Sequence, residues 1–317
     1  MEWTRILRYL APNLVTFSSL TFGLASIVCS FEGRYAPAAW FIMWSVLADK
    51  LDGFVARLLK ASTEFGVQLD SLADFLNFGV APAVLVYAFL TRASELPFVS
   101  GFGSVLVMFA SLLWVFAVTF RLARYNVVGD DPRCRRIFFG VPTTLMGGVV
   151  ATYFLTCLKY SGGGISYAAQ VSFDEPRFFG NLVLPKMAFE IIPHLMIAGA
   201  LLMASTLKIP KLGLSKSKAL SAFILVNVGF GYLFGFGRKL PEYLVLLPMI
   251  WIVSSILWGL FSSEARSLRP PPLIPKKDRP ASQLPQRPEE DALPDEDDAV
   301  SEPPPPAPAA REARAKS

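Results

Sequence analysis

The chain has 317 residues, of which 53% are hydrophobic and only 17% are charged, and its formal net charge is +5. Repeated apolar runs of about 20 residues exclude an ordinary soluble domain, because helices of that length cross the hydrocarbon of a bilayer. The runs do not alternate polar and apolar residues as barrel strands do. An all-α, polytopic transmembrane helical bundle is therefore predicted. Membrane lipids are its expected partners, and no nucleic acid is expected to bind.

The first residues, 1–11, place apolar side chains at helical spacing, with arginines elsewhere on the wheel. The apolar positions are Trp3, Ile6, Leu7 and Leu10. They predict an amphipathic juxtamembrane helix, although an ordinary lead-in to the first span explains them equally well. Eight spans are then expected, at 12–32, 36–59, 72–91, 101–124, 141–159, 185–206, 217–236 and 241–262.

Basic residues are denser at one set of span ends than at the other. The richer ends carry Arg5, Arg8, Arg57, Lys60, Arg121, Arg124, Arg133, Arg135, Arg136, Lys208, Lys211, Lys216 and Lys218. Because cytoplasmic loops of membrane proteins carry an excess of lysine and arginine, these ends are expected in the cytoplasm. Both termini of this multi-pass protein are then cytoplasmic.

Four regions follow from this pattern. They are the helix at 1–11, a membrane core at 12–206, two additional transmembrane helices within 207–263 and a tail at 264–317. The tail is rich in proline and charge and nearly free of aromatic residues. It lacks the apolar surface that folding requires, so a disordered cytoplasmic tail is expected.

Carboxylates are the metal ligands that this chain offers. It has 3 cysteines without a CxxC pair and 1 histidine, so a zinc site built on thiolate or imidazole is excluded. Hard ions such as Mg²⁺ or Mn²⁺ prefer oxygen ligands and are the expected metals.

Four aspartates interrupt the apolar sequence around the second and third spans. Asp49 and Asp52 are three residues apart near the end of the second span, and Asp70 and Asp74 are four apart near the start of the third. Each pair shares one face of its helix. A turn near residues 60–64 makes the two spans an antiparallel hairpin, so the four carboxylates are expected to converge near the cytoplasmic face.

A cluster of four carboxylates in a low dielectric predicts a site for two divalent cations, since like charges would otherwise repel strongly. Gly53 and Gly66 lack side chains beside the acids and leave room for close helix approach or for a ligand. Arg57 can pair with an acid or a phosphate oxygen. Structural ion pairs with Arg57 and Lys50 account for two acids at most, and a transporter's ion relay is the other alternative.

Residues 49–74 spell D-x-x-D-G-x-x-A-R-x8-G-x-x-x-D-x-x-x-D. This stretch resembles the signature of the CDP-alcohol phosphatidyltransferases, membrane enzymes that transfer a phosphatidyl group from a CDP-linked lipid to an alcohol and release CMP. The resemblance implies two divalent ions, with Asp49, Asp52 and Asp70 as ligands and Asp74 as both ligand and general base. It also implies a homodimer.

The same resemblance implies a CDP-lipid site formed by Gly53, Ala56, Arg57, Gly66, Asn13 and Thr16. Capping or interhelical hydrogen bonds explain Asn13 and Thr16 nearly as well. Arg121 and Arg124 lie one turn apart at the cytoplasmic end of the fourth span. They are expected to bind the acceptor's carboxylate or a lipid phosphate, with anchoring by positive charge as the alternative.

Three further segments resemble the serine-specific members of the family: PNLVTFSSLTFGLASI at 12–27, LDSLADFLNFGVAPA at 69–83 and RLARYN at 121–126. They imply CDP-diacylglycerol and L-serine as substrates. Two departures lie where an acceptor would bind: Asn77 replaces a serine, and FFGVPTT at 138–144 replaces F-x-G-L-P-x-P. Glycerol phosphate or inositol phosphate as acceptor, a cation-coupled transporter and an inactive lipid-binding homologue therefore stay as alternatives.

Overall fold

A computed structural model describes residues 2–59, 63–128, 137–173, 175–210 and 218–262. For residues 2–12, 56, 57, 128 and 218–220 it describes the backbone alone. The described residues belong to one compact unit, Met1–Leu273. The expected tail at 264–317 lies outside them.

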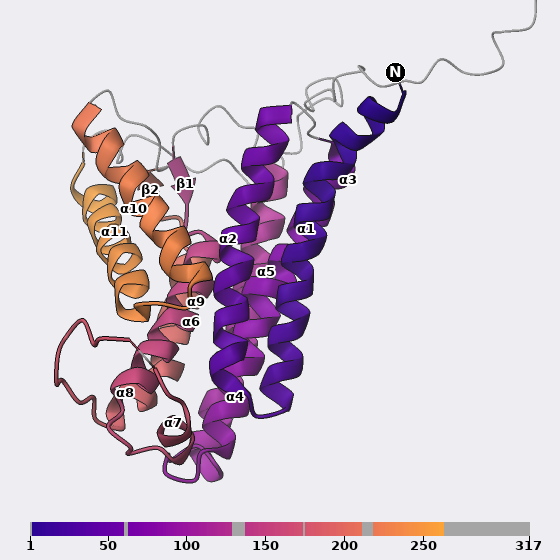
Figure 1. Ribbon diagram of the computed structural model, residues 1–317. Helices are drawn as coiled ribbons and strands as arrows, with labels where there is room; N and C mark the ends of the chain where they lie inside the picture. The colour runs from indigo at the N-terminus through magenta and orange to yellow at the C-terminus, as the bar shows by residue number, and fades with distance from the viewer. Residues whose placement is uncertain (1, 60–62, 129–136, 174, 211–217, 263–317) are drawn as a thin grey trace, which may run out of the picture. The chain divides into compact units, whose positions relative to one another are not determined.

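The described chain is mostly helical (Figure 1). Its elements, in order, are α1 Glu2–Phe31, α2 Tyr35–Leu59, α3 Glu64–Asp74, the π-helix η1 Phe75–Val80, α4 Ala81–Arg92, α5 Gly101–Val128, β1 Ile137–Phe139, α6 Thr143–Tyr160, α7 Ser166–Gln170, α8 Met187–Glu190, α9 Ile192–Ala204, β2 Lys208–Pro210, α10 Lys218–Phe236 and α11 Pro241–Phe261. The predicted helical class is confirmed apart from two short strands, and the eight spans stay a prediction. The expected surface helix at 1–11 and the first span form one continuous helix, α1.

Five stretches of the described chain are long and apolar enough to cross a membrane. They are Asn13–Phe31, Glu64–Arg92, Gly101–Val127, Met187–Ala204 and Pro241–Phe261. The span predicted at 72–91 begins earlier in the structure, at Glu64, because the polar residues around Asp70 belong to the first turns of the same helical stretch.

A π-helix was not expected, and it interrupts the second of these stretches immediately after Asp74. A π-helix inserts one residue into a helical turn and weakens the local ladder of backbone hydrogen bonds. The carbonyl of Phe78 in η1 accepts a 2.8 Å hydrogen bond from Trp114 Nε1 on α5. The neighbouring helix therefore supplies a partner for this part of the segment.

Two short strands close the end of the bundle where α5 ends and α6 begins. β1 pairs antiparallel with β2, with Phe138 opposite Ile209. The Arg124 guanidinium donates hydrogen bonds to three backbone carbonyls there, those of Phe139 (2.5 Å), Met203 (3.1 Å) and Ala204 (3.0 Å). Arg124 thus joins the end of α5 to β1 and to the end of α9.

Candidate functional site

The α2–α3 hairpin brings the expected acids together. Thr63 caps α3 by accepting a 3.0 Å hydrogen bond from the Gly66 amide, which fixes where the second arm of the hairpin begins. Asp49, Asp70 and Asp74 each offer a carboxylate oxygen, and these three atoms lie within 4.8 Å of one another. The predicted convergence is confirmed for these three residues.

Asp52 lies beside this cluster but faces α1. Only 6% of the residue is exposed, and its Oδ2 accepts a 3.0 Å hydrogen bond from Thr16 Oγ1. Its charge still acts on Asp70. The structure therefore forms a tight group of three acids with the fourth held next to it by α1.

The donor set of the three clustered acids fits a hard divalent cation. Carboxylate oxygens are the preferred ligands of Mg²⁺ and Mn²⁺, and three of them at this spacing repel one another unless a positive charge lies between them. Zinc prefers nitrogen and sulfur ligands, which the described part of this cluster does not provide.

The start of α6 approaches the acids from a third direction. The Thr144 hydroxyl and the Asp74 carboxyl are both in hydrogen-bonding contact with Asp49. Thr144 ends the segment FFGVPTT and stands where the family pattern has proline. The position at which this segment departs from the family pattern therefore lies at the acidic site.

Arg121 is a buried cation next to the acids. It is 7% exposed, its charge acts on Asp74, and its Nη1 donates a 3.4 Å hydrogen bond to Thr143 Oγ1. Its Nε has no hydrogen-bond partner among the described residues. Arg121 and Arg124, expected to act together, are thus separated: Arg121 faces the acids and Arg124 binds backbone carbonyls of β1 and α9.

The expected nucleotide residues are brought together only in part. A Cβ atom on Gly66 would lie 3.3 Å from Asn13 Oδ1, so the missing side chain allows α3 to approach α1 closely. Thr16 makes the interhelical bond to Asp52 that the sequence offered as an alternative to nucleotide contact. Gly53 is half-buried on α2. The side chains of Ala56 and Arg57 lie outside the described residues.

Asn77 lies where η1 packs on α1, and its expected place beside the acceptor stays a prediction. The residue is fully buried, and its Nδ2 donates a 2.8 Å hydrogen bond to Ser19 Oγ on α1. Its Oδ1 lies where a Cβ atom on Gly23 would collide with it. The Asn77 amide therefore links η1 to α1 through its Nδ2, and its Oδ1 has no hydrogen-bond partner among the described residues.

Comparison with known proteins covers the part of the chain that carries this site. The family model described as CDP-alcohol phosphatidyltransferase matches residues 9–173. The chain is 36% identical over 154 residues to the CDP-diacylglycerol–serine O-phosphatidyltransferase of Helicobacter pylori. The aligned residues cover 48% of this chain and 60% of that protein. It is 38% identical over 156 residues to the Mycobacterium leprae protein of the same name, 48% of each chain.

A third relative is the archaetidylserine synthase of Methanothermobacter thermautotrophicus. It is 29% identical over 177 residues, which are 53% of this chain and 70% of that protein. The matched part spans only 60% and 48% of the first two relatives.

Proposed function

The chain belongs to the CDP-alcohol phosphatidyltransferase family, and we propose that it transfers the phosphatidyl group of CDP-diacylglycerol to L-serine, giving phosphatidylserine and CMP. The observation that carries this proposal is the convergence of Asp49, Asp70 and Asp74 at the end of the α2–α3 hairpin. The names of the relatives at 36% and 38% identity support serine as the acceptor.

We assign the four aspartates to a site for two divalent ions, Mg²⁺ or Mn²⁺. Asp49, Asp70 and Asp74 form its centre, and Asp52 contributes from the α1 side, where the Thr16 hydroxyl orients its carboxylate. Bound there, the ions would polarise the pyrophosphate of the lipid substrate and offset the charge on departing CMP.

Asp74 is proposed as the general base. It takes the proton of the serine hydroxyl while the serine oxygen forms a bond to the phosphorus of the phosphatidyl group and the bond from that phosphorus to the CMP oxygen breaks. Arg121 is proposed to bind the serine carboxylate, because a buried guanidinium with an unpartnered Nε lies next to the base. Arg124, engaged by three carbonyls, is proposed to hold the acceptor side of the site in shape.

The CDP-lipid is proposed to bind along α1, α2 and α3. The residues assigned to it are Gly53, Ala56, Arg57, Gly66, Asn13 and Thr16. The close approach of α3 to α1 at Gly66, beside Asn13, brings residues of this set from two helices together and supports the assignment. Arg57 would supply a positive charge to a phosphate oxygen.

The proposed topology has eight spans, in which α2, α6 and α10 cross the membrane together with the five stretches given above. The core would then extend over 12–206, with two further spans within 207–263. Both termini and the acidic site would face the cytoplasm, and the protein would form a homodimer. The hydroxyl acceptor would enter from water and the lipid substrate from the bilayer.

Release of CMP from CDP-diacylglycerol by the purified protein tests the function. The assay compares Mg²⁺, Mn²⁺ and a chelator, with L-serine, glycerol 3-phosphate or inositol phosphate as acceptor. Metal-dependent release with L-serine alone supports the proposal, whereas release with another acceptor keeps the mechanism and changes the substrate. No release with any acceptor contradicts the enzyme and favours a transporter, which would show cation flux in sealed vesicles.

A further inference from the structure

The C-terminal helix α10 packs against α2 next to the first acid of the site (Figure 1). The Tyr232 hydroxyl donates a 3.1 Å hydrogen bond to the carbonyl of Leu47, two residues before Asp49. One turn further along α10, the Gly235 carbonyl accepts a 2.9 Å hydrogen bond from Trp44 Nε1. A Cβ atom on Gly235 would lie 2.7 Å from Leu47 Cδ1, so the two helices are in close contact.

The acids of the site also act electrostatically on Tyr232. The charges of Asp49 and Asp52 both act on its hydroxyl, which is half-buried between α10 and α2. Yet α10 lies beyond residues 9–173, the part that matches the family. A residue outside the matched region therefore contacts the helix that carries two of the proposed metal ligands.

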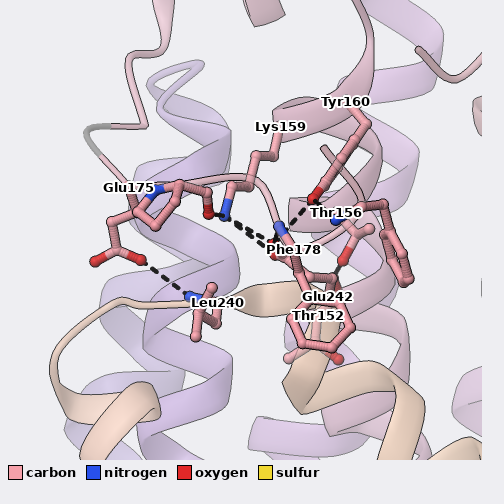
Figure 2. Close-up of polar contacts among 10 residues, drawn as sticks. Thr152, Thr156, Lys159, Tyr160, Glu175, Phe178, Leu240 and Glu242 are labelled. Carbon is pink, nitrogen blue, oxygen red and sulfur yellow. Dashed lines mark hydrogen bonds and ion pairs between the residues drawn. The ribbon is translucent and has the colours of Figure 1, made fainter. Parts of the chain in front are cut away.

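A buried ion pair fixes the partner helix α11 to the core (Figure 2). Lys159 Nζ on α6 lies 2.9 Å from Glu242 Oε1 and 3.2 Å from Oε2, and the two side chains are 1% and 0% exposed. Glu242 Oε1 also accepts hydrogen bonds from the Tyr160 hydroxyl (3.0 Å) and the Phe178 amide (2.9 Å). Breaking a buried pair leaves an uncompensated charge, so α11 is held firmly on α6.

The helix α11 in turn holds α10. The Tyr243 hydroxyl donates a 2.7 Å hydrogen bond to Asn227 Oδ1, and its ring stands edge-on to Phe234 at 5.3 Å between centroids. Contacts therefore run from the core through Glu242 and Tyr243 to α10, the helix that carries Tyr232.

We propose that α10 and α11 brace the acidic site, with Tyr232 as a positioning residue that fixes α2 where Asp49 and Asp52 project from it. Hydrogen bonds behind the ligands set the direction of the ligands, and their loss weakens metal binding. This inference rests on the proposed function, because it takes the aspartates as metal ligands. Tyr232 itself binds neither metal nor substrate.

The test is Tyr232→Phe in the full-length protein, which removes one hydroxyl and keeps the ring. Binding of Mn²⁺ is measured by electron paramagnetic resonance in lipid nanodiscs without substrate. The dissociation constant is expected to rise about tenfold. The matched control is Tyr153→Phe, which removes a tyrosine hydroxyl that donates a 3.0 Å hydrogen bond from α6 to the Ala188 carbonyl of α8, outside the α10–α11 contacts, and is expected to leave Mn²⁺ affinity unchanged.

A second variant, Trp44→Phe, removes the bond to the Gly235 carbonyl and should weaken Mn²⁺ binding in the same direction, so the test stands even if Tyr232→Phe folds poorly. Wild-type affinity in both α2-contact variants overturns the proposal. So does an equal loss in Tyr153→Phe, which would indicate a general loosening of the helical bundle. If Mn²⁺ binding depends on Tyr232 but no acceptor yields CMP, the positioning role of Tyr232 is supported and the proposed reaction is contradicted.

Discussion

Thr16 Oγ1 donates a 3.0 Å hydrogen bond to Asp52 Oδ2, and this bond connects the first helix to an acid of the proposed metal site. Both residues are buried, at 5% and 6% exposure. A hydrogen bond to a charged group in such surroundings is worth more than one between neutral groups. The orientation of Asp52 therefore depends on how α1 packs against α2.

Replacing Thr16 by valine keeps the shape of the side chain and removes the donor to Asp52. The loss of a charge-assisted hydrogen bond, about 1.5–3 kcal/mol, is expected to weaken Mn²⁺ binding and to raise the metal concentration needed for CMP release. Thr21→Val is the control, because the Thr21 hydroxyl donates its hydrogen bond to the Phe17 carbonyl of its own helix. Equal metal dependence in the two variants would contradict the role of Thr16.

Asp74→Asn removes the proposed base without changing its volume. Turnover is expected to fall about 10²- to 10⁴-fold, because a positioned base contributes that much to proton transfer. CMP release in a single turnover measures the effect, and thermal unfolding checks that the protein is folded. Glu175→Gln, an equivalent change in the loop before α8, should keep full activity. Near-normal turnover by Asp74→Asn would contradict the assignment of Asp74 as the general base.

The two arginines of α5 are expected to respond differently to replacement by lysine. Arg121→Lys should raise the KM for L-serine and reduce the preference for serine over serinamide, which lacks the carboxylate. Arg124→Lys should lower the melting temperature and keep that preference, because Arg124 binds the carbonyls of Phe139, Met203 and Ala204. Loss of the preference in Arg124→Lys alone would reverse the two assignments.

Glu242→Gln leaves the buried Lys159 without its counter-charge. Destabilisation of about 3–5 kcal/mol is expected. The double variant Lys159→Met/Glu242→Leu should recover part of it, because it carries no unpaired charge but still removes the acceptor of the Tyr160 hydroxyl and the Phe178 amide. Glu175→Gln is the control: its 3.6 Å pair with Lys239, whose side chain is 58% exposed, should contribute at most about 1 kcal/mol. Thermal unfolding in detergent compares all three, and similar losses in the two single variants would argue against a special role of burial.

The sequence alone determined the membrane class and the core of the acidic site. Both depend on local regularities: the apolar runs have the length of a membrane helix, and spacings of three and four residues put Asp49 with Asp52 and Asp70 with Asp74 on single helix faces. A short turn between two helices leaves few ways for the pairs to meet. The structure accordingly joins Asp49, Asp70 and Asp74 as expected.

Only the tertiary structure decided which polar residues surround that core. Arg121 and Arg124 look equivalent in the sequence, yet helix rotation turns one to Asp74 and the other to the carbonyls of β1 and α9. Tyr232 meets Leu47 across 185 positions of the chain. Such contacts depend on the angle and depth at which separate helices pack, and those are set by the fit of many side chains at once, which no local spacing encodes.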